Sequence, residues 1–177
     1  MGHANKSQFL PVNIAVLTVS DSRSLSDDRS GDTLVERLQA DGHILADRAI
    51  VKDEIPIIAA QLQKWIEDEG VEVVISTGGT GVTGRDVTPE ALASVWEKEI
   101  PGFGELFRWI SYQKIKTSTI QSRACAGVAG GTYMFALPGS PGACKDAWDE
   151  ILHEQLDIRH KPCNFVEMMP RLMEHME

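Results

Sequence analysis

Short apolar runs recur along this chain, and each is followed by a polar or glycine-rich stretch and then, in most cases, by a segment with helical spacing. The runs at 13–19, at 132–137 and from Val73 onward are almost continuously apolar, which is typical of strands buried on both faces. The run at 44–51 alternates in part and carries two charged residues, which favours a place nearer the edge of a sheet. The pattern therefore predicts a sheet with at least these four strands.

Helical spacing fills the segments between the runs. The expected helices are 31–40 with Ser30 as N-cap, 55–69 before Gly70, 89–99 with Thr88 as N-cap, the stretch after a break at 101–104, and 142–156 with Ser140 as N-cap. Alternating strands and helices predict an α/β fold, a Rossmann-like three-layer sandwich with a mostly parallel sheet flanked by helices on both faces. We expect one domain over residues 1–177, with a core at about 12–164, a flexible N-terminus and a methionine-rich C-terminal tail.

Polar or glycine residues stand at the carboxyl end of every predicted strand, where ligands bind in parallel sheets. These stretches are Ser20-Asp21, Asp53-Glu54, Thr77 to Asp86, and Pro138 to Ser140. Because they converge on one edge, a binding cleft is the favoured interpretation. The pair Asp27-Asp28, in contrast, is expected to belong to a solvated loop.

The glycine-rich stretch after Val73 does not fit the common phosphate-binding motifs. A Walker A loop ends in Gly-Lys-Ser/Thr, whereas Gly84 is followed by Arg85 and Asp86. The spacing 79–84 matches a dinucleotide fingerprint, but the next helix starts only at Pro89, so we interpret the match as accidental. Successive backbone N–H groups can still cradle an anion, and a glycine turn without any ligand remains the alternative.

Composition narrows the function classes. A formal charge of −9 argues against a sequence-independent grip on nucleic acid. The three cysteines form no close pair, which is typical of reduced thiols, and the chain contains neither an 18-residue apolar run nor a signal-peptide core. We therefore expect a cytoplasmic protein without a membrane segment or a nucleic-acid partner.

Three carboxylates, those of Asp21, Asp53 and Asp86, belong to the same predicted edge as two glycine-rich stretches that could bind an anion, at 78–84 and at 138–142. Carboxylates repel a phosphate unless a divalent cation bridges them, and Mg²⁺ is the usual bridge. No histidine lies in these loops, so no nucleophile–base pair is evident. Phosphoryl or nucleotidyl transfer by positioning and charge neutralisation needs no such pair. The residues therefore indicate a magnesium-nucleotide or another phosphorylated ligand.

The predicted helix after 101–104 is apolar on more than one side. Phe103, Phe107 and Ile110 share a stripe with Leu106, whereas Trp109 and Tyr112 point elsewhere. A helix that is apolar on two sides is usually buried on two sides. We therefore expect a homo-oligomer with residues 103–112 at or near a subunit contact.

Several motifs together resemble the MoaB/Mog family of molybdenum-cofactor biosynthesis proteins. They are Ser-Thr-Gly-Gly-Thr-Gly at 76–81, Asp-Val-Thr-Pro-Glu-Ala at 86–91, Pro-Gly-Phe-Gly-Glu at 101–105, Ser122-Arg123, and Leu-Pro-Gly-Ser at 137–140, and the likeness extends over about 12–164. The resemblance implies a trimeric or hexameric α/β protein that binds molybdopterin. Active members use ATP and Mg²⁺ to adenylylate its terminal phosphate, which gives adenylyl-molybdopterin and pyrophosphate.

The resemblance also implies roles for individual residues. Asp53 and Asp86 match the two acids associated with activity, and we expect them to hold Mg²⁺ and the ATP phosphates. Glu105 belongs to a shared motif. The nucleotide or phosphate side would use Ser20, Asp21, Thr77, Gly78, Gly79, Thr80 and Gly81, and the pterin side Ser118, Arg123, Pro138, Gly139 and Ser140.

The chain resembles the B type of the family in its length, in its Ser-Thr-Ile-Gln-Ser-Arg-Ala segment at 118–124 and in its Lys-Pro-Cys-Asn-Phe segment at 161–165. Some close B-type relatives lack the two acids, whereas this chain has both. The alternatives are a carrier that binds molybdopterin without reacting it, and molybdate insertion, which usually requires further domains.

Overall fold

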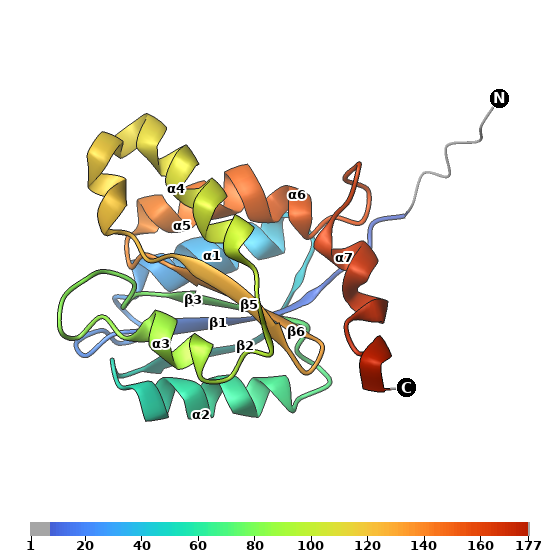
Figure 1. The fold of residues 1–177 in the computed structure, drawn as a ribbon, viewed down its shortest axis with the longest axis horizontal. Coiled ribbons are helices and arrows are strands. Elements are labelled where there is room, and N and C mark those ends of the chain that lie inside the picture. The colour runs from blue at the N-terminus through green and yellow to red at the C-terminus, as the bar shows by residue number, and fades with distance from the viewer. Residues whose placement is uncertain (1–7, 177) are drawn as a thin grey trace.

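The computed structural model describes residues 8–176, which form one six-stranded sheet with the order β2-β1-β3-β6-β5-β4 (Figure 1). The parallel strands are β1 Asn13–Val19, β2 Ile44–Val51, β3 Val73–Thr77 and β6 Thr132–Leu137. The antiparallel strands are β4 Lys98–Glu99 and β5 Cys125–Ala129. β2 lies at one edge, as its charged residues predict.

Helices cover both faces of the sheet, so the predicted three-layer α/β architecture is confirmed. On one face lie α1 Arg29–Ala40, α4 Pro101–Ile115 and α5 Pro141–Ala147, and on the other lie α2 Ile55–Ile66 and α3 Thr88–Ala93 (Figure 1). Side chains of β1 alternate between the two layers: Ile14 belongs to the core cluster that contains the α1 and α4 residues, and Leu17 belongs to the cluster that contains the α2 residues. Within the described residues, no helix is both long enough and apolar enough to cross a membrane.

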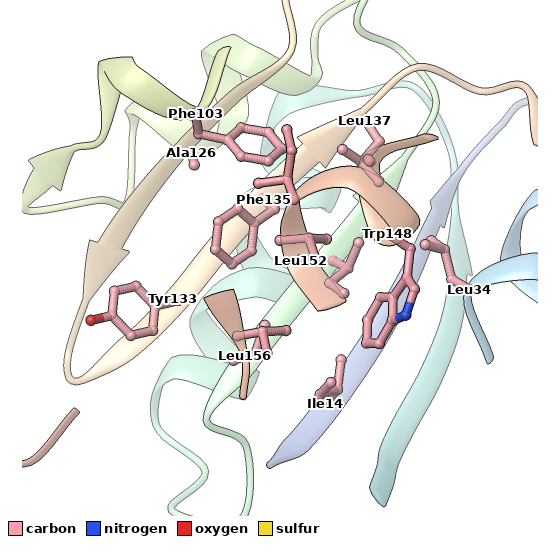
Figure 2. Packing of buried hydrophobic residues seen from close by; sticks show 14 of the residues in the cluster. Ile14, Leu34, Phe103, Ala126, Tyr133, Phe135, Leu137, Trp148, Leu152 and Leu156 are labelled. Carbon is pink, nitrogen blue, oxygen red and sulfur yellow. The ribbon is translucent and has the colours of Figure 1, made fainter. Parts of the chain in front are cut away.

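The larger core is built around aromatic side chains of β6 and of the segment after α5. Phe135 meets Phe103 of α4 edge to face, with ring centroids 5.0 Å apart, and Trp148 lies fully buried near Leu34 (Figure 2). Trp148 belongs to a π-helical turn, Trp148–Leu152, between α5 and the short α6 His153–Gln155. The predicted helix 142–156 is therefore helical as far as Gln155 but contains this wider turn.

The antiparallel end of the sheet was not predicted. The expected helix 89–99 ends at Ala93, and the chain then forms β4 against β5. β5 consists of Cys-Ala-Gly-Val-Ala, whose small side chains give no strand signal. The small side chains serve packing instead: Gly127 allows Trp96 to lie against the backbone, because a Cβ on Gly127 would lie only 2.5 Å from the indole ring. Two smaller differences are that α2 ends at Ile66 and that Pro101 begins α4 directly.

Two predicted helix caps were also wrong. Asp28, rather than Ser30, caps α1 by accepting a hydrogen bond from the Gly31 amide, and Asp28 is fully buried rather than solvated. Val87, rather than Thr88, occupies the N-cap of α3, because the Thr88 hydroxyl donates to the carbonyl oxygen of Gly78. Ser140 caps α5 as predicted, with Oγ 3.2 Å from the Ala143 amide nitrogen.

The C-terminal tail packs in part against the sheet. It contains α7 Phe165–Met168 and the 3₁₀ turns Met169–Arg171 and Glu174–Met176. The Phe165 ring lies 4.7 Å from the Tyr133 ring of β6, whereas Met168 and Met176 are exposed. The predicted flexible N-terminus falls, for residues 1–7, outside the described residues.

Candidate functional site

Two glycine turns meet at the carboxyl ends of β3 and β6. Gly78 has φ +104° and Gly79 has φ +66°, both in the left-handed region that favours glycine. A Cβ on Gly78 would collide with the Val19 carbonyl oxygen, and one on Gly139 would lie 3.2 Å from the Gly78 Cα. The two turns therefore lie against each other without room for side chains.

A pocket of about 410 Å³ opens on one side of these turns. Its lining residues come from the two turns, from α4, from the first turn of α5, and from the 3₁₀ helix Lys116–Gln121 with the residue that follows it. They are Gly79, Thr80, Gly81, Asp86, Phe107, Ser111, Ile115, Ser118, Thr119, Gln121, Ser122, Pro138, Gly139, Ser140 and Ala143. The pocket thus brings together most of the residues that the sequence assigned to the glycine loop and to the pterin side.

A smaller pocket of about 170 Å³ shares Gly139 with the first. It is lined by Thr18, Val19, Ser20, Arg23, Ser30, Asp53, Thr77, Gly78 and Gly139. It lies where β1 and β3 lead into different loops, which is the usual position of ligands in open parallel sheets. The glycine turns therefore form a wall with a pocket on each side.

Asp86 stands on the wall of the larger pocket, where its surroundings favour the ionised form. Its Oδ2 accepts hydrogen bonds from the Thr83 hydroxyl at 2.6 Å and from the Thr83 amide at 2.8 Å. These bonds, together with those from backbone amides and the charge of Arg123, hold the pKa of Asp86 below its usual value. The carboxylate lies so close to Gly81 that a Cβ there would be 2.7 Å from it.

Asp53 stands on the other side of the glycine loop, and its charge is disfavoured. Burial, and then repulsion from Asp21 and Asp86, raise its pKa, although Arg85 opposes this. A Cβ on Gly79 would lie 3.1 Å from its Oδ1. Asp53 and Asp86 therefore flank the same glycine loop with opposite shifts in pKa.

Asp21 links this region to the tip of the glycine loop. Its carboxylate accepts two hydrogen bonds from the Arg85 guanidinium, at 2.7 and 2.9 Å, and these hold its pKa below the usual value. The Asp53 amide also donates to Asp21, at 3.4 Å. Asp21 and Asp53 are therefore neighbours, and Asp86 acts on Asp53 through its charge, which helps to raise the pKa of Asp53.

A magnesium ion fits this chemistry. Within residues 8–176, no three histidine, cysteine or acidic side chains are close enough to form a complete metal cage. Mg²⁺, however, usually takes one or two carboxylates and completes its shell with phosphate oxygens and water. Asp53 is suited to this, because a cation would relieve the repulsion that disfavours its charge.

Several predicted site residues have other surroundings than the resemblance implies. Arg123 lies outside the larger pocket, and its guanidinium donates to the carbonyl oxygens of Gly81 and Asp86, both at 2.6 Å. Glu105 is exposed on α4 and lines neither pocket. Thr77 is fully buried and donates to the Pro138 carbonyl oxygen, so its side chain ties the two turns together.

The sequence reasoning missed the wall that α4 supplies. Phe107, Ser111 and Ile115 line the larger pocket and are spaced by four residues, so they share one face of α4. The signal in the sequence that could have revealed this wall is Ser111, a serine that shares a helical face with the apolar Phe107 and Ile115. Cys125 and Cys144 are free thiols whose pKa burial raises to about 11, which makes them poor nucleophiles near neutral pH.

Comparisons with known proteins give one consistent result. The model of the family described as the probable molybdopterin binding domain matches residues 15–158. Molybdenum cofactor biosynthesis protein B of Escherichia coli K12 is 50% identical over 159 residues, which cover 90% of this chain and 94% of that protein.

Solved structures agree with this result. A crystal structure of a molybdenum cofactor biosynthesis protein B superposes with a TM-score of 0.78 at 36% identity and covers 95% of this chain and 98% of that one. The Mog protein of Mycobacterium ulcerans superposes with a TM-score of 0.71 at 31% identity and covers 83% of this chain and 96% of that one.

Proposed function

This chain belongs to the family of the probable molybdopterin binding domain and takes part in molybdenum cofactor biosynthesis, and from that premise we propose that it is a Mg-ATP-dependent molybdopterin adenylyltransferase. The observation that carries the proposal is the glycine wall with a pocket on each side and a carboxylate on each side, Asp86 in one and Asp53 in the other. With such a wall, two ligands can bind in adjoining pockets, and their phosphates can meet at the glycine loop between the pockets.

The larger pocket would hold the pterin. Its volume of about 410 Å³ falls in the usual range for small-molecule sites, and its walls combine the Phe107 ring with the hydroxyls of Ser118 and Ser140. The terminal phosphate of molybdopterin would lie toward the glycine turns. There the side chains are small and backbone N–H groups can approach an anion closely.

The nucleotide would bind across the loop Gly78–Gly81 toward Ser20 and Asp53 of the smaller pocket, and toward Asp21, which accepts a hydrogen bond from the Asp53 amide. Asp53 and Asp86 would hold Mg²⁺, which neutralises phosphate charge when bound. In the reaction, an oxygen of the molybdopterin phosphate forms a bond to the α-phosphorus of ATP. The bond from that phosphorus to the β-phosphate breaks, and pyrophosphate leaves with the bonding electrons. No proton transfer is required, which agrees with a site without a histidine.

The direct test is incubation of the protein with molybdopterin, ATP and Mg²⁺, followed by mass detection of adenylyl-molybdopterin and pyrophosphate. The expected result is a product that depends on all three components and disappears with EDTA. A protein that binds molybdopterin yet forms no product under these conditions would contradict the proposal.

A carrier of molybdopterin is the second candidate, and one observation favours it. Both hydrogen bonds of the Asp86 Oδ2 atom come from Thr83, so this carboxylate could serve only to shape its loop. Isothermal titration separates the two functions: an adenylyltransferase binds ATP in a magnesium-dependent way, whereas a carrier binds molybdopterin alone.

We also propose that the chain forms a homo-oligomer through α4, as its apolar pattern indicates. Leu106, Trp109, Tyr112 and Ile115 are 42%, 66%, 45% and 53% exposed. Large apolar side chains gathered on one exposed helix are a feature of association surfaces. Because Ile115 also lines the larger pocket, the contact would lie next to the pterin side.

A further inference from the structure

The side chain of Arg123 is fully engaged with the chain that carries Asp86. Its Nε donates to the carbonyl oxygen of Gly81 and its Nη2 to that of Asp86, both at 2.6 Å, and its Nη1 pairs with the Glu90 carboxylate. Its backbone amide donates to the Thr80 carbonyl oxygen at 2.9 Å. One residue thus holds both ends of the loop between Gly81 and Asp86 and the first turn of α3.

The loop between those ends has few other attachments to the body of the protein. Val82 is 67% exposed, and a Cβ on Gly84 would meet nothing within 4 Å. The bonds between Thr83 and Asp86 are internal to the loop, and the Arg85–Asp21 pair joins two exposed side chains. Exposed pairs of this kind contribute little, so the Arg123 bonds are the main tether.

Arg123 is itself held in place from α4. The Nη1 of Arg108 donates to the Ala124 carbonyl oxygen at 2.9 Å and to that of Ser122 at 3.4 Å. Gly104 permits this approach, because a Cβ there would collide with the Ala124 carbonyl oxygen. The position of the loop is therefore linked to α4, because Arg108 of α4 holds the backbone on both sides of Arg123, and Arg123 holds the loop.

We propose that Arg123 is a positioning residue, which aims the Asp86 carboxylate and the N–H groups of the glycine loop into the larger pocket without touching a ligand. This inference rests on the proposed function. The carbonyl oxygens of Gly81 and Asp86 face Arg123, which does not line that pocket, so they turn away from the place where a phosphate would bind. A planar guanidinium can hold two carbonyls at fixed spacing, whereas an ammonium cannot.

The test compares Arg123→Gln and Arg123→Lys with wild type, and uses Arg37→Gln as a matched control. Arg37 makes a similar forked pair, with Asp149, and lines neither pocket of the site. We expect Arg123→Gln to lower kcat of adenylylation about 100-fold, since displacing a reacting group by about 1 Å has an effect of this size. Its molybdopterin Kd should stay within about three-fold of wild type, and Arg123→Lys should restore little of the activity.

Hydrogen exchange provides a readout that does not depend on activity. In both Arg123 variants, the amides of residues 81–87 should exchange faster than in wild type, while those of β1 and β3 keep their rates. Unchanged exchange at 81–87 in Arg123→Gln would overturn the inference. A parallel loss of kcat and molybdopterin affinity would also overturn it, because it would indicate direct contact, and so would full recovery by Arg123→Lys. If wild type itself forms no adenylyl-molybdopterin, the proposed function fails, whereas the exchange result still decides the role of Arg123.

Discussion

The Oδ2 atom of Asp28 lies 2.9 Å from Nη2 of Arg48 and is completely shielded from solvent. The same carboxylate accepts hydrogen bonds from the Thr18 hydroxyl at 2.6 Å and the Gly31 amide at 3.0 Å. Burial alone would raise the pKa of Asp28, but the bonds from Arg48, Thr18 and Gly31 outweigh it and hold the pKa below its usual value. This carboxylate joins β1, β2 and the start of α1.

Asp28→Ala is therefore expected to destabilise the fold by about 3–4 kcal/mol. The variant leaves the Arg48 guanidinium, which is only 19% exposed, without its buried partner, and it removes the cap of α1. The measurement is the free energy of unfolding in urea. Asp27→Ala is the control, because Asp27 is exposed and bonds only within its own turn. Equal losses in the two variants would contradict the role of Asp28.

Asp86→Asn should lower adenylylation by about 10²–10³-fold, because it removes a charge from the reacting site. The asparagine can still accept from Thr83, so the melting temperature should change by only a few degrees. Molybdopterin affinity should remain within a few-fold of wild type. Turnover and titration with molybdopterin measure the two effects separately.

Thr83→Ala distinguishes a catalytic Asp86 from one that only shapes the loop. It removes the 2.6 Å bond to the Asp86 carboxylate but leaves the charge in place. If the charge matters, Thr83→Ala keeps most of the activity. If both variants lose activity to the same extent, Asp86 acts through loop structure instead.

Gly78→Ala should destabilise the protein by about 3 kcal/mol or more. Its φ of +104° is strained for alanine, and the new Cβ would collide with the Val19 carbonyl oxygen. Gly102→Ala in the first turn of α4 is the matched control, since a Cβ there meets nothing within 4 Å and alanine favours helix. Thermal unfolding of the two variants should move in opposite directions, and a stable Gly78→Ala would contradict the close approach of the two turns.

Stability should fall as the pH is lowered below about 6.5, because the His43 ring is only 5% exposed and its burial disfavours the charged form. Burial lowers its pKa from the usual 6.5, although the charges of Asp41 and Asp157 oppose this and that of His153 adds to it. Its Nδ1 accepts a hydrogen bond from the Val12 amide at 3.2 Å. Below pH 6.5, His43 therefore binds a proton in the unfolded chain, whereas in the folded chain it stays neutral until the pH reaches its lower folded pKa. Between these two pKa values the free energy of unfolding falls as the pH is lowered.

The corresponding measurement is the urea midpoint at pH 7.5 and at pH 5.5 for wild type and His43→Asn. An asparagine can still accept the Val12 bond but does not titrate. The difference between the two pH values should be smaller in the variant. An equal pH dependence in both proteins would show that other groups cause it.

Light scattering should give a mass that is a multiple of 19.5 kDa, and Trp109→Glu should reduce it toward a single chain. Trp109 is 66% exposed on α4, and a charge there would oppose association through this helix. Ile57→Glu on α2 is the control, because Ile57 is 39% exposed on the opposite face of the sheet. A monomeric wild type at micromolar concentration would exclude the proposed contact.

The sequence by itself determined the central strands, the glycine loop and the cap of α5. The nearly continuous apolar run 13–19 has only one environment that suits it, the middle of a parallel sheet. Ser140-Pro141 places a cap and a first helical residue side by side, and both act locally. Signals of this kind depend on neighbours within a few positions, so they can be read without the fold.

Only the tertiary structure decided which polar side chains are buried and which carbonyls they reach. The sequence around Asp28 does not show whether its side chain is solvated or buried. Its burial depends on Arg48 of β2, which lies 20 residues further along the chain and which the fold places beside the carboxylate. The sequence analysis assigns Arg123 to the pterin side, yet its Nε donates a hydrogen bond to the carbonyl oxygen of Gly81, 42 positions earlier. β5 has small side chains without a strand pattern and becomes a strand because β6 and Trp96 pack beside it. Such outcomes depend on contacts between distant segments, which form only when the sheet is assembled.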